Sequence, residues 1–175
     1  MHEPWLHLYS RAELESDFEK SEAAILNATG CRPSGFRGPG FSSSPLVRQM
    51  LVERGYRYDA SLFPTTLGPV ARAYFLLKSN LPPDEKQKRS GLYGSLADAY
   101  RTLRPFEIEP GLMEVPVTTM PVVRFPVHLS YLLFLAQYSE ALARLYWRMA
   151  VTLCRIQNIG PSLLLHPTDF LDGTD

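Results

Sequence analysis

The sequence predicts an α/β protein with a parallel sheet or barrel whose ligand site lies at the carboxyl ends of the strands. Two observations predict it: helical patterns alternate with short strand patterns, and polar clusters follow several of those strands. The chain has 175 residues, of which 45% are hydrophobic and 21% charged. That is enough for a sizeable core, so we expect residues 1–175 to form a single domain.

The first expected element is an amphipathic surface helix from Arg11 to Ala28. Ser10 and Glu13 have the spacing of a capping box, in which the hydroxyl and the carboxylate each accept a hydrogen bond from a backbone amide at the helix start. Gly30 provides the left-handed residue that commonly ends a helix. These caps define both ends of the helix.

Residues 35–60 have the order strand, helix, strand. A short strand is expected at 35–37, and Ser44 followed by Pro45 marks the start of a second helix. That helix ends at Gly55, and residues 56–60 form the next strand. This order is typical of α/β proteins.

Residues 65–110 have a different composition, with scattered prolines and a charged run, and we interpret them as a long insertion that could form a lid. Weak helical patterns occur within it at 70–78 and 96–103. The elements expected after the insertion are a strand at 112–117, helices at 129–136 and 139–157, and a last buried strand at 162–165.

Charge and composition exclude several classes of protein. Lys and Arg together equal Asp and Glu at 18 each, so no net charge attracts nucleic acid or an anionic membrane. Binding to either needs a local patch, and none stands out. The most apolar stretch, 127–136, spans about ten residues where a membrane helix needs about twenty. Cys31 and Cys154 have no metal-site spacing.

The start of the chain has no secretory pattern. Met1 is followed by His2, Glu3 and Pro4 instead of a basic and then an apolar segment. As written, the sequence predicts a cytoplasmic protein.

Three clusters that contain polar residues give the best indication of function. They are His2 with His7, the segment Gly35-Phe36-Arg37-Gly38-Pro39-Gly40-Phe41, and the segment Leu163-Leu164-Leu165-His166-Pro167-Thr168-Asp169. Their order resembles the polysaccharide deacetylase family, which has the NodB homology domain. Gly55-Tyr56-Arg57-Tyr58-Asp59-Ala60-Ser61 and Met113-Glu114-Val115-Pro116-Val117 also resemble family segments. The likeness runs from His2 to Leu171 and covers the insertion poorly.

The resemblance implies a (β/α)-barrel of the NodB type that removes N-acetyl groups from a carbohydrate. In that family an aspartate and two histidines hold a divalent metal, usually zinc, with open positions for water and substrate. The Asp-containing first motif occurs nowhere in this chain, so we expect a partial barrel without its first strands, and an inactive fragment is left open as an alternative. Exposed sheet edges in such a barrel would favour a homo-oligomer.

The resemblance also assigns roles to individual residues. His2 aligns with a metal ligand, although His2 and His7 are separated by five positions and not by the family's four. Arg37 matches the arginine that positions the catalytic aspartate, and His166 matches the general acid that protonates the leaving amine. Pro39, Phe41 and Leu164 are expected to line the substrate pocket.

Alternatives without a role in catalysis or metal binding remain open for His2, Arg37 and His166. His2 could be a terminal residue that binds nothing, Arg37 a surface or helix-capping arginine, and His166 a hydrogen-bonded core histidine. Two other functions also remain open: an allantoinase-like C–N hydrolase of the same fold, and a non-catalytic remnant that binds a glycan or another subunit.

Overall fold

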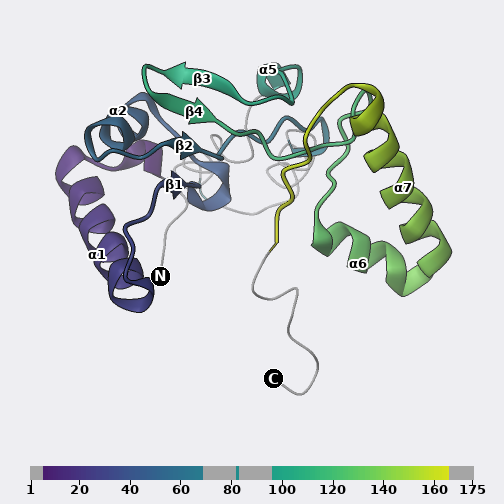
Figure 1. The fold of residues 1–175 in the computed structure, drawn as a ribbon, viewed down its shortest axis with the longest axis horizontal. Coiled ribbons are helices and arrows are strands. Elements are labelled where there is room, and N and C mark those ends of the chain that lie inside the picture. Colours follow the sequence, from purple (N-terminus) through teal and green to yellow (C-terminus); the bar gives the residue numbers. More distant parts are fainter. Residues whose placement is uncertain (1–5, 69–81, 83–95, 166–175) are drawn as a thin grey trace.

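The chain folds into a mixed α/β structure around a four-stranded sheet of strand order β1-β2-β4-β3 (Figure 1). The structure is a computed structural model that describes residues 6–68, 82 and 96–165. The predicted α/β class is confirmed at this level. The described elements are η1 (Leu6–Leu8), α1 (Arg11–Thr29), β1 (Gly35–Phe36), η2 (Pro39–Phe41), α2 (Pro45–Glu53), β2 (Tyr58–Asp59), α5 (Leu96–Ala99), β3 (Phe106–Glu109), β4 (Leu112–Glu114), α6 (Leu129–Tyr138) and α7 (Glu140–Ile156).

Helix α1 has the caps that the sequence predicts. The Glu13 side chain accepts a hydrogen bond from the Ser10 backbone N–H at 2.8 Å, and Gly30 ends the helix with φ of 72°. Leu14 and Phe18 are its buried residues. The carboxylate of Glu22 accepts two hydrogen bonds from Arg54, at 2.7 and 2.9 Å, and so ties α1 to the end of α2.

Helix α2 also begins as predicted, with the Ser44 hydroxyl accepting from the Val47 N–H and proline in the first turn. It connects β1 to β2, which pair in parallel, and β2 pairs in parallel with β4. Together, α1 and α2 bury one face of this sheet (Figure 1). The residues of this core are Leu6, Leu14, Phe18, Val47, Met50, Leu51, Tyr56 and Leu112.

The sheet differs from the expected parallel one at its other edge. Residues 106–109, which the sequence analysis places in the insertion, form β3 and pair antiparallel with β4. The turn between them contains Gly111 with φ of 80°, and its N–H donates to the Glu107 carboxylate at 2.8 Å. Pro110-Gly111 follows a segment in which apolar and polar residues alternate, and this combination indicates a hairpin. Strand β3 was therefore predictable from the sequence, although it was not predicted.

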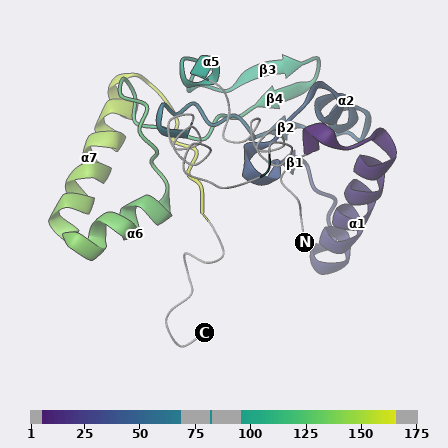
Figure 2. The same cartoon turned by 180° about the vertical axis from the view of Figure 1, so that it is seen from behind.

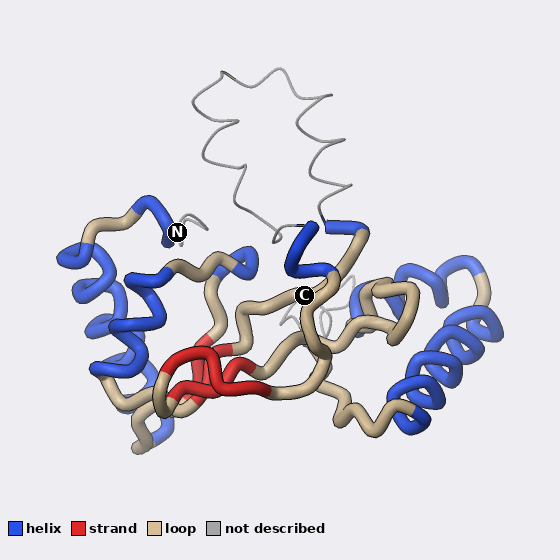
Figure 3. Tube along the Cα trace, turned by 90° about the horizontal axis from the view of Figure 1, so that it is seen from above, coloured by secondary structure: helices blue, strands red, loops and turns tan. Residues whose placement is uncertain are grey.

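Helices α6 and α7 meet at Ser139 and form a V at the end of the molecule opposite α1 (Figure 2). Seen from above, this pair stands clear of the sheet (Figure 3). Both helices were predicted. The inner side of α7 contributes Ala150 to a small core with Met120 and Val127.

Two other predictions need a correction or lie outside the described residues. Residues 162–165 do not form a strand; they form an extended segment in which the Ser162 carbonyl accepts from the Thr118 N–H at 2.9 Å. The helical pattern at 96–103 extends only over α5, and the one at 70–78 lies outside the described residues. No helix within the described ranges is long and apolar enough to cross a membrane.

Candidate functional site

The three parallel strands end side by side and bring Arg37, Asp59 and Glu114 to the same edge of the sheet. Phe36 is the register partner of Asp59, and Asp59 is the register partner of Glu114. Arg37 is the next residue along β1. The sheet therefore collects one cation and two carboxyl groups at the carboxyl ends of its strands, which is where α/β proteins place their functional groups.

Arg37 bridges the first two strand ends. Its Nε donates to the Ala60 carbonyl at 3.0 Å, while the Ala60 N–H donates to the Phe36 carbonyl at 2.8 Å. Arg37 is exposed, and both Asp59 and Glu114 attract its positive charge. The expected charge-assisted bond to a carboxylate is not among its contacts with the described residues, where its side-chain hydrogen bond goes to a carbonyl.

Asp59 and Glu114 are both buried, with 0% and 2% of their surface exposed. Asp59 accepts three hydrogen bonds, from the Ser61 N–H at 3.0 Å and from the Ser61 and Ser43 hydroxyls at 2.5 and 3.3 Å. Glu114 accepts one from the Leu62 N–H at 2.9 Å. The pair thus holds the segment after β2 against the loop before α2.

Burial and mutual repulsion make these carboxyl groups hard to ionise together. Burial, and after it the neighbouring charge of Asp59, raise the pKa of Glu114 to about 8. Burial also raises the pKa of Asp59, but the serine hydrogen bonds act in the opposite direction. Because hydrogen bonds to the charged form favour ionisation, we assign the negative charge to Asp59 and the proton to Glu114 at neutral pH.

The loop after β1 is held in an unusual conformation. Gly40 and Phe41 both have left-handed backbones, with φ of 59° and 63°, and such a conformation is costly for phenylalanine. The Phe41 ring stacks on Phe63 with centroids 4.6 Å apart. The Gly38 N–H donates to the Ser61 hydroxyl at 2.8 Å, so the loop is tied to the segment that follows β2.

Leu164 belongs to the same cluster. It is 5% exposed and packs with Phe63 and Val117, and Phe41 lies against these three residues. The Leu129 N–H donates to the Leu164 carbonyl at 3.3 Å. The two motifs that include Phe41 and Leu164, separated by more than a hundred positions in the sequence, therefore lie together in the fold.

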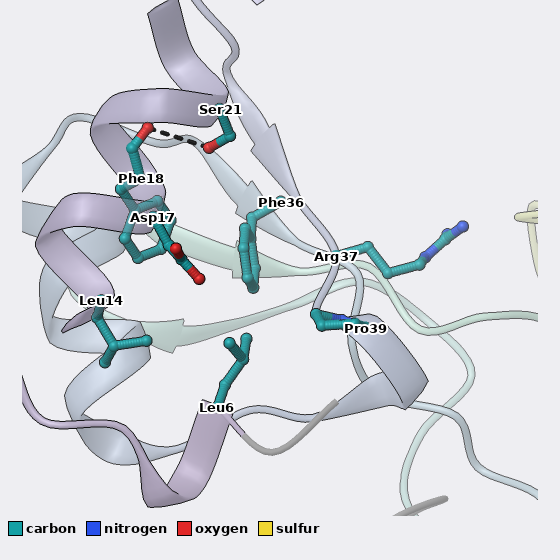
Figure 4. A pocket seen from close by; sticks show the side chains of 8 residues that line it. All are labelled: Leu6, Leu14, Asp17, Phe18, Ser21, Phe36, Arg37 and Pro39. Carbon is teal, nitrogen blue, oxygen red and sulfur yellow. Dashed lines mark hydrogen bonds between the residues drawn. The ribbon is translucent and has the colours of Figure 1, made fainter. Parts of the chain in front are cut away.

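A cavity of about 280 Å³ lies between α1 and β1. Its apolar walls come from Leu6, Leu14, Phe18 and Phe36, and Arg37 and Pro39 lie at one side of it. The Arg37 side chain points away from these walls (Figure 4). The cavity is thus mainly a feature of the core and does not face the guanidinium.

His2 and His166 lie outside the described residues, so the structure places neither the expected metal ligand nor the expected general acid. His7 is exposed in η1. Across residues 6–68, 82 and 96–165, no group of three or more His, Cys, Asp or Glu side chains could hold a metal. The described residues therefore do not supply the ligand set that the resemblance implies.

Two buried polar residues near the site were not singled out as candidates from the sequence. Glu114 appeared only within the expected strand and the family-like segment at 113–117, without a role of its own. His128 precedes α6 and lies between Tyr131 and Phe63, with ring centroids 4.3 and 6.2 Å from its own. A polar residue before an apolar helix signals a cap, but its burial beside Phe63 depends on the tertiary fold.

Comparisons of the chain with protein-family models, with curated proteins and with solved structures found no match.

Proposed function

We propose that this chain is part of a NodB-type (β/α)-barrel enzyme that hydrolyses the N-acetyl group of a carbohydrate. The observation that carries the proposal is the contact of Phe41 with the cluster of Phe63, Val117 and Leu164. It brings the Arg-Gly-Pro-Gly-Phe loop next to the segment that leads to His166. Both segments resemble the deacetylase family, and their meeting at the strand ends supports a common site.

Arg37 is the residue proposed to hold an anionic group at this site. A guanidinium is planar and can donate two parallel hydrogen bonds to a carboxylate or to a developing oxyanion. The bond from Nε to the Ala60 carbonyl fixes the side chain at its base. The negative charge of Asp59 attracts the guanidinium and partly offsets the cost of its desolvation.

Water adds to the amide carbonyl carbon, and His166 is proposed to protonate the leaving nitrogen as the C–N bond breaks, so that the acyl group leaves as acetate and the sugar keeps the amine. An imidazole with a pKa near neutrality suits this transfer. Pro39, Phe41 and Leu164 would form the apolar wall beside the acyl group. We propose no step through a zinc ion, because the described residues do not supply its ligands.

Asp59 and Glu114 are proposed to be positioning residues and not catalytic ones. Their side chains are almost fully inaccessible, so neither could contact a substrate. They hold the ends of β2 and β4 in place and attract the guanidinium of Arg37.

The test is release of acetate by the full-length gene product that contains these residues. N-acetylated chito-oligosaccharides and allantoin are supplied separately, with zinc and with a chelator. We expect acetate from the oligosaccharides in the presence of zinc and no turnover of allantoin. Turnover of allantoin alone would instead identify a ureide hydrolase. A folded protein that binds the oligosaccharide without acetate release would identify a binding remnant.

A further inference from the structure

The V formed by α6 and α7 exposes an unusually apolar surface. No residue of α6 is buried and none of it is charged. The large apolar side chains exposed on the two helices are Tyr131, Leu133, Phe134, Tyr138, Leu142, Leu145, Met149 and Ile156, which we call the hairpin face. Tyr138 and Ile156 are each 74% exposed. So many large apolar side chains exposed on two adjacent helices of one protein point to an interaction site.

The spacing of these residues places them in stripes. On α6, Tyr131, Phe134 and Tyr138 follow one another at i, i+3 and i+7, the repeat of a single helix face. On α7, the exposed apolar stripe begins at Leu142 and continues through Leu145 to Met149 at the same spacing. Each helix therefore presents an exposed apolar stripe, and on α7 this stripe is separate from the side that buries Ala150 and Cys154.

Arginines line the edge of the α7 stripe. Arg144, Arg148 and Arg155 occur at i, i+4 and i+11, which is a second face next to the apolar one. Arg144 pairs with Glu140 at 2.9 Å. Between residues 115 and 165, four arginines stand against one glutamate, a net charge of +3. The hairpin is therefore both apolar and basic.

The opposite end of the molecule has no such excess of positive charge. Helix α1 contains five acidic and two basic residues, a net charge of −3. Residues 6–68 as a whole contain seven acidic and seven basic residues and are neutral. A partner of the hairpin face has to be apolar in its interior and anionic at its surface.

We propose that the hairpin face binds the surface of an anionic lipid bilayer. The apolar side chains would enter the boundary between headgroups and acyl chains, and the arginines would extend their charged ends to the lipid phosphates. Tyrosine suits this depth because its ring is apolar and its hydroxyl polar. The helices lie in the interface and do not cross it.

A second copy of the chain fits this surface less well. A two-fold symmetric dimer would place the hairpin faces against each other. Both hairpins carry the same net positive charge, and like charges brought together at an interface oppose association. Anionic lipid satisfies the apolar stripes and the arginines at once.

The test is co-sedimentation of the full-length gene product with vesicles. We compare pure phosphatidylcholine with vesicles in which about one-third of the lipid is phosphatidylglycerol. We expect binding only to the anionic vesicles, and weaker binding as salt increases. The double variant Arg148→Gln/Arg155→Gln should bind roughly fivefold more weakly for each arginine removed. The matched control Arg32→Gln/Arg57→Gln, at exposed positions away from the hairpin, should bind as the parent protein does.

A second pair of variants tests the apolar contribution. Phe134→Ser combined with Leu145→Ser should also weaken binding, whereas Tyr100→Ser, at a site 79% exposed outside the hairpin, should not. Circular dichroism verifies that each variant is folded. Equal sedimentation with both vesicle types, or none with either, would overturn the proposal. So would a dimer in light scattering that Leu145→Ser converts to a monomer without any vesicle binding.

Discussion

Asp59 and Glu114 are register partners on β2 and β4, and the charge of Asp59 is one cause of the raised pKa of Glu114. In the unfolded chain both ionise at the ordinary values of Asp and Glu. In the folded chain the pKa of Glu114 is about 8. Between about pH 4.5 and about pH 8 the folded state thus binds more protons than the unfolded state, so the contribution of Glu114 to stability falls as pH rises.

Glu114→Gln should remove this dependence. Glutamine keeps an oxygen that can accept the Leu62 N–H but does not titrate. We expect the variant to match the parent protein near about pH 5 and to exceed it near about pH 9, by an amount on the order of a few kcal/mol. Urea unfolding at both pH values measures the difference. A difference that stays constant with pH would show that Glu114 is ionised throughout.

Replacing glycine by alanine adds a Cβ atom, and the atoms that lie nearest to this Cβ differ between Gly38 and Gly35. At Gly38 an added Cβ would lie 1.8 Å from the Ser42 carbonyl oxygen, which is backbone. At Gly35 it would lie 2.0 Å from the ring of Tyr58, whose side chain is half-exposed and can turn away. We expect Gly38→Ala to cost about 3 kcal/mol or more and Gly35→Ala about 1 kcal/mol.

Thermal and urea unfolding of the two glycine variants compare these costs. Tyr58→Ala serves as the control, because it should abolish the cost of Gly35→Ala and leave that of Gly38→Ala unchanged. An equal loss of unfolding free energy at the two positions would contradict this prediction. It would mean that the backbone from Gly38 to Ser42 can move to make room for the added methyl group.

At the scale of elements, helix α1 depends on its capping box. Ser10→Ala removes the hydroxyl that accepts from the Glu13 N–H and contacts the Glu13 carboxylate. We expect a loss of about 1 kcal/mol in the free energy of unfolding. Ser10→Thr retains a hydroxyl and should lose little. If alanine and threonine give the same stability, the box contributes nothing to the fold.

The helices with local end signals were predictable to within one or two residues. Ser10, Ser44 and Ser139 cap their helices as their positions in the sequence indicate. The strands were harder, because each is short and its pairing depends on distant residues. Residues 162–165 are apolar enough for a strand, yet they bond to Thr118 and Leu129 and do not enter the sheet.

At the scale of the whole molecule, the sequence did not predict which charged groups gather at the ends of the parallel strands. The burial of Glu114 beside Asp59 follows from the parallel register of β2 and β4, which no local pattern encodes. The same is true of His128, and of the separation of acidic α1 from basic α7. These features arise only when distant segments pack together.

The most direct test of the proposed function compares three variants of the full-length gene product in acetate release from N-acetylated chito-oligosaccharides. Arg37→Lys and His166→Gln should each lower kcat/KM by roughly a hundredfold, because they remove the planar donor and the proton donor. Arg57→Lys, a matched change at an exposed arginine of the neighbouring strand end, should leave kcat/KM unchanged. Full activity in Arg37→Lys and His166→Gln, or no acetate from the parent protein, would contradict the account.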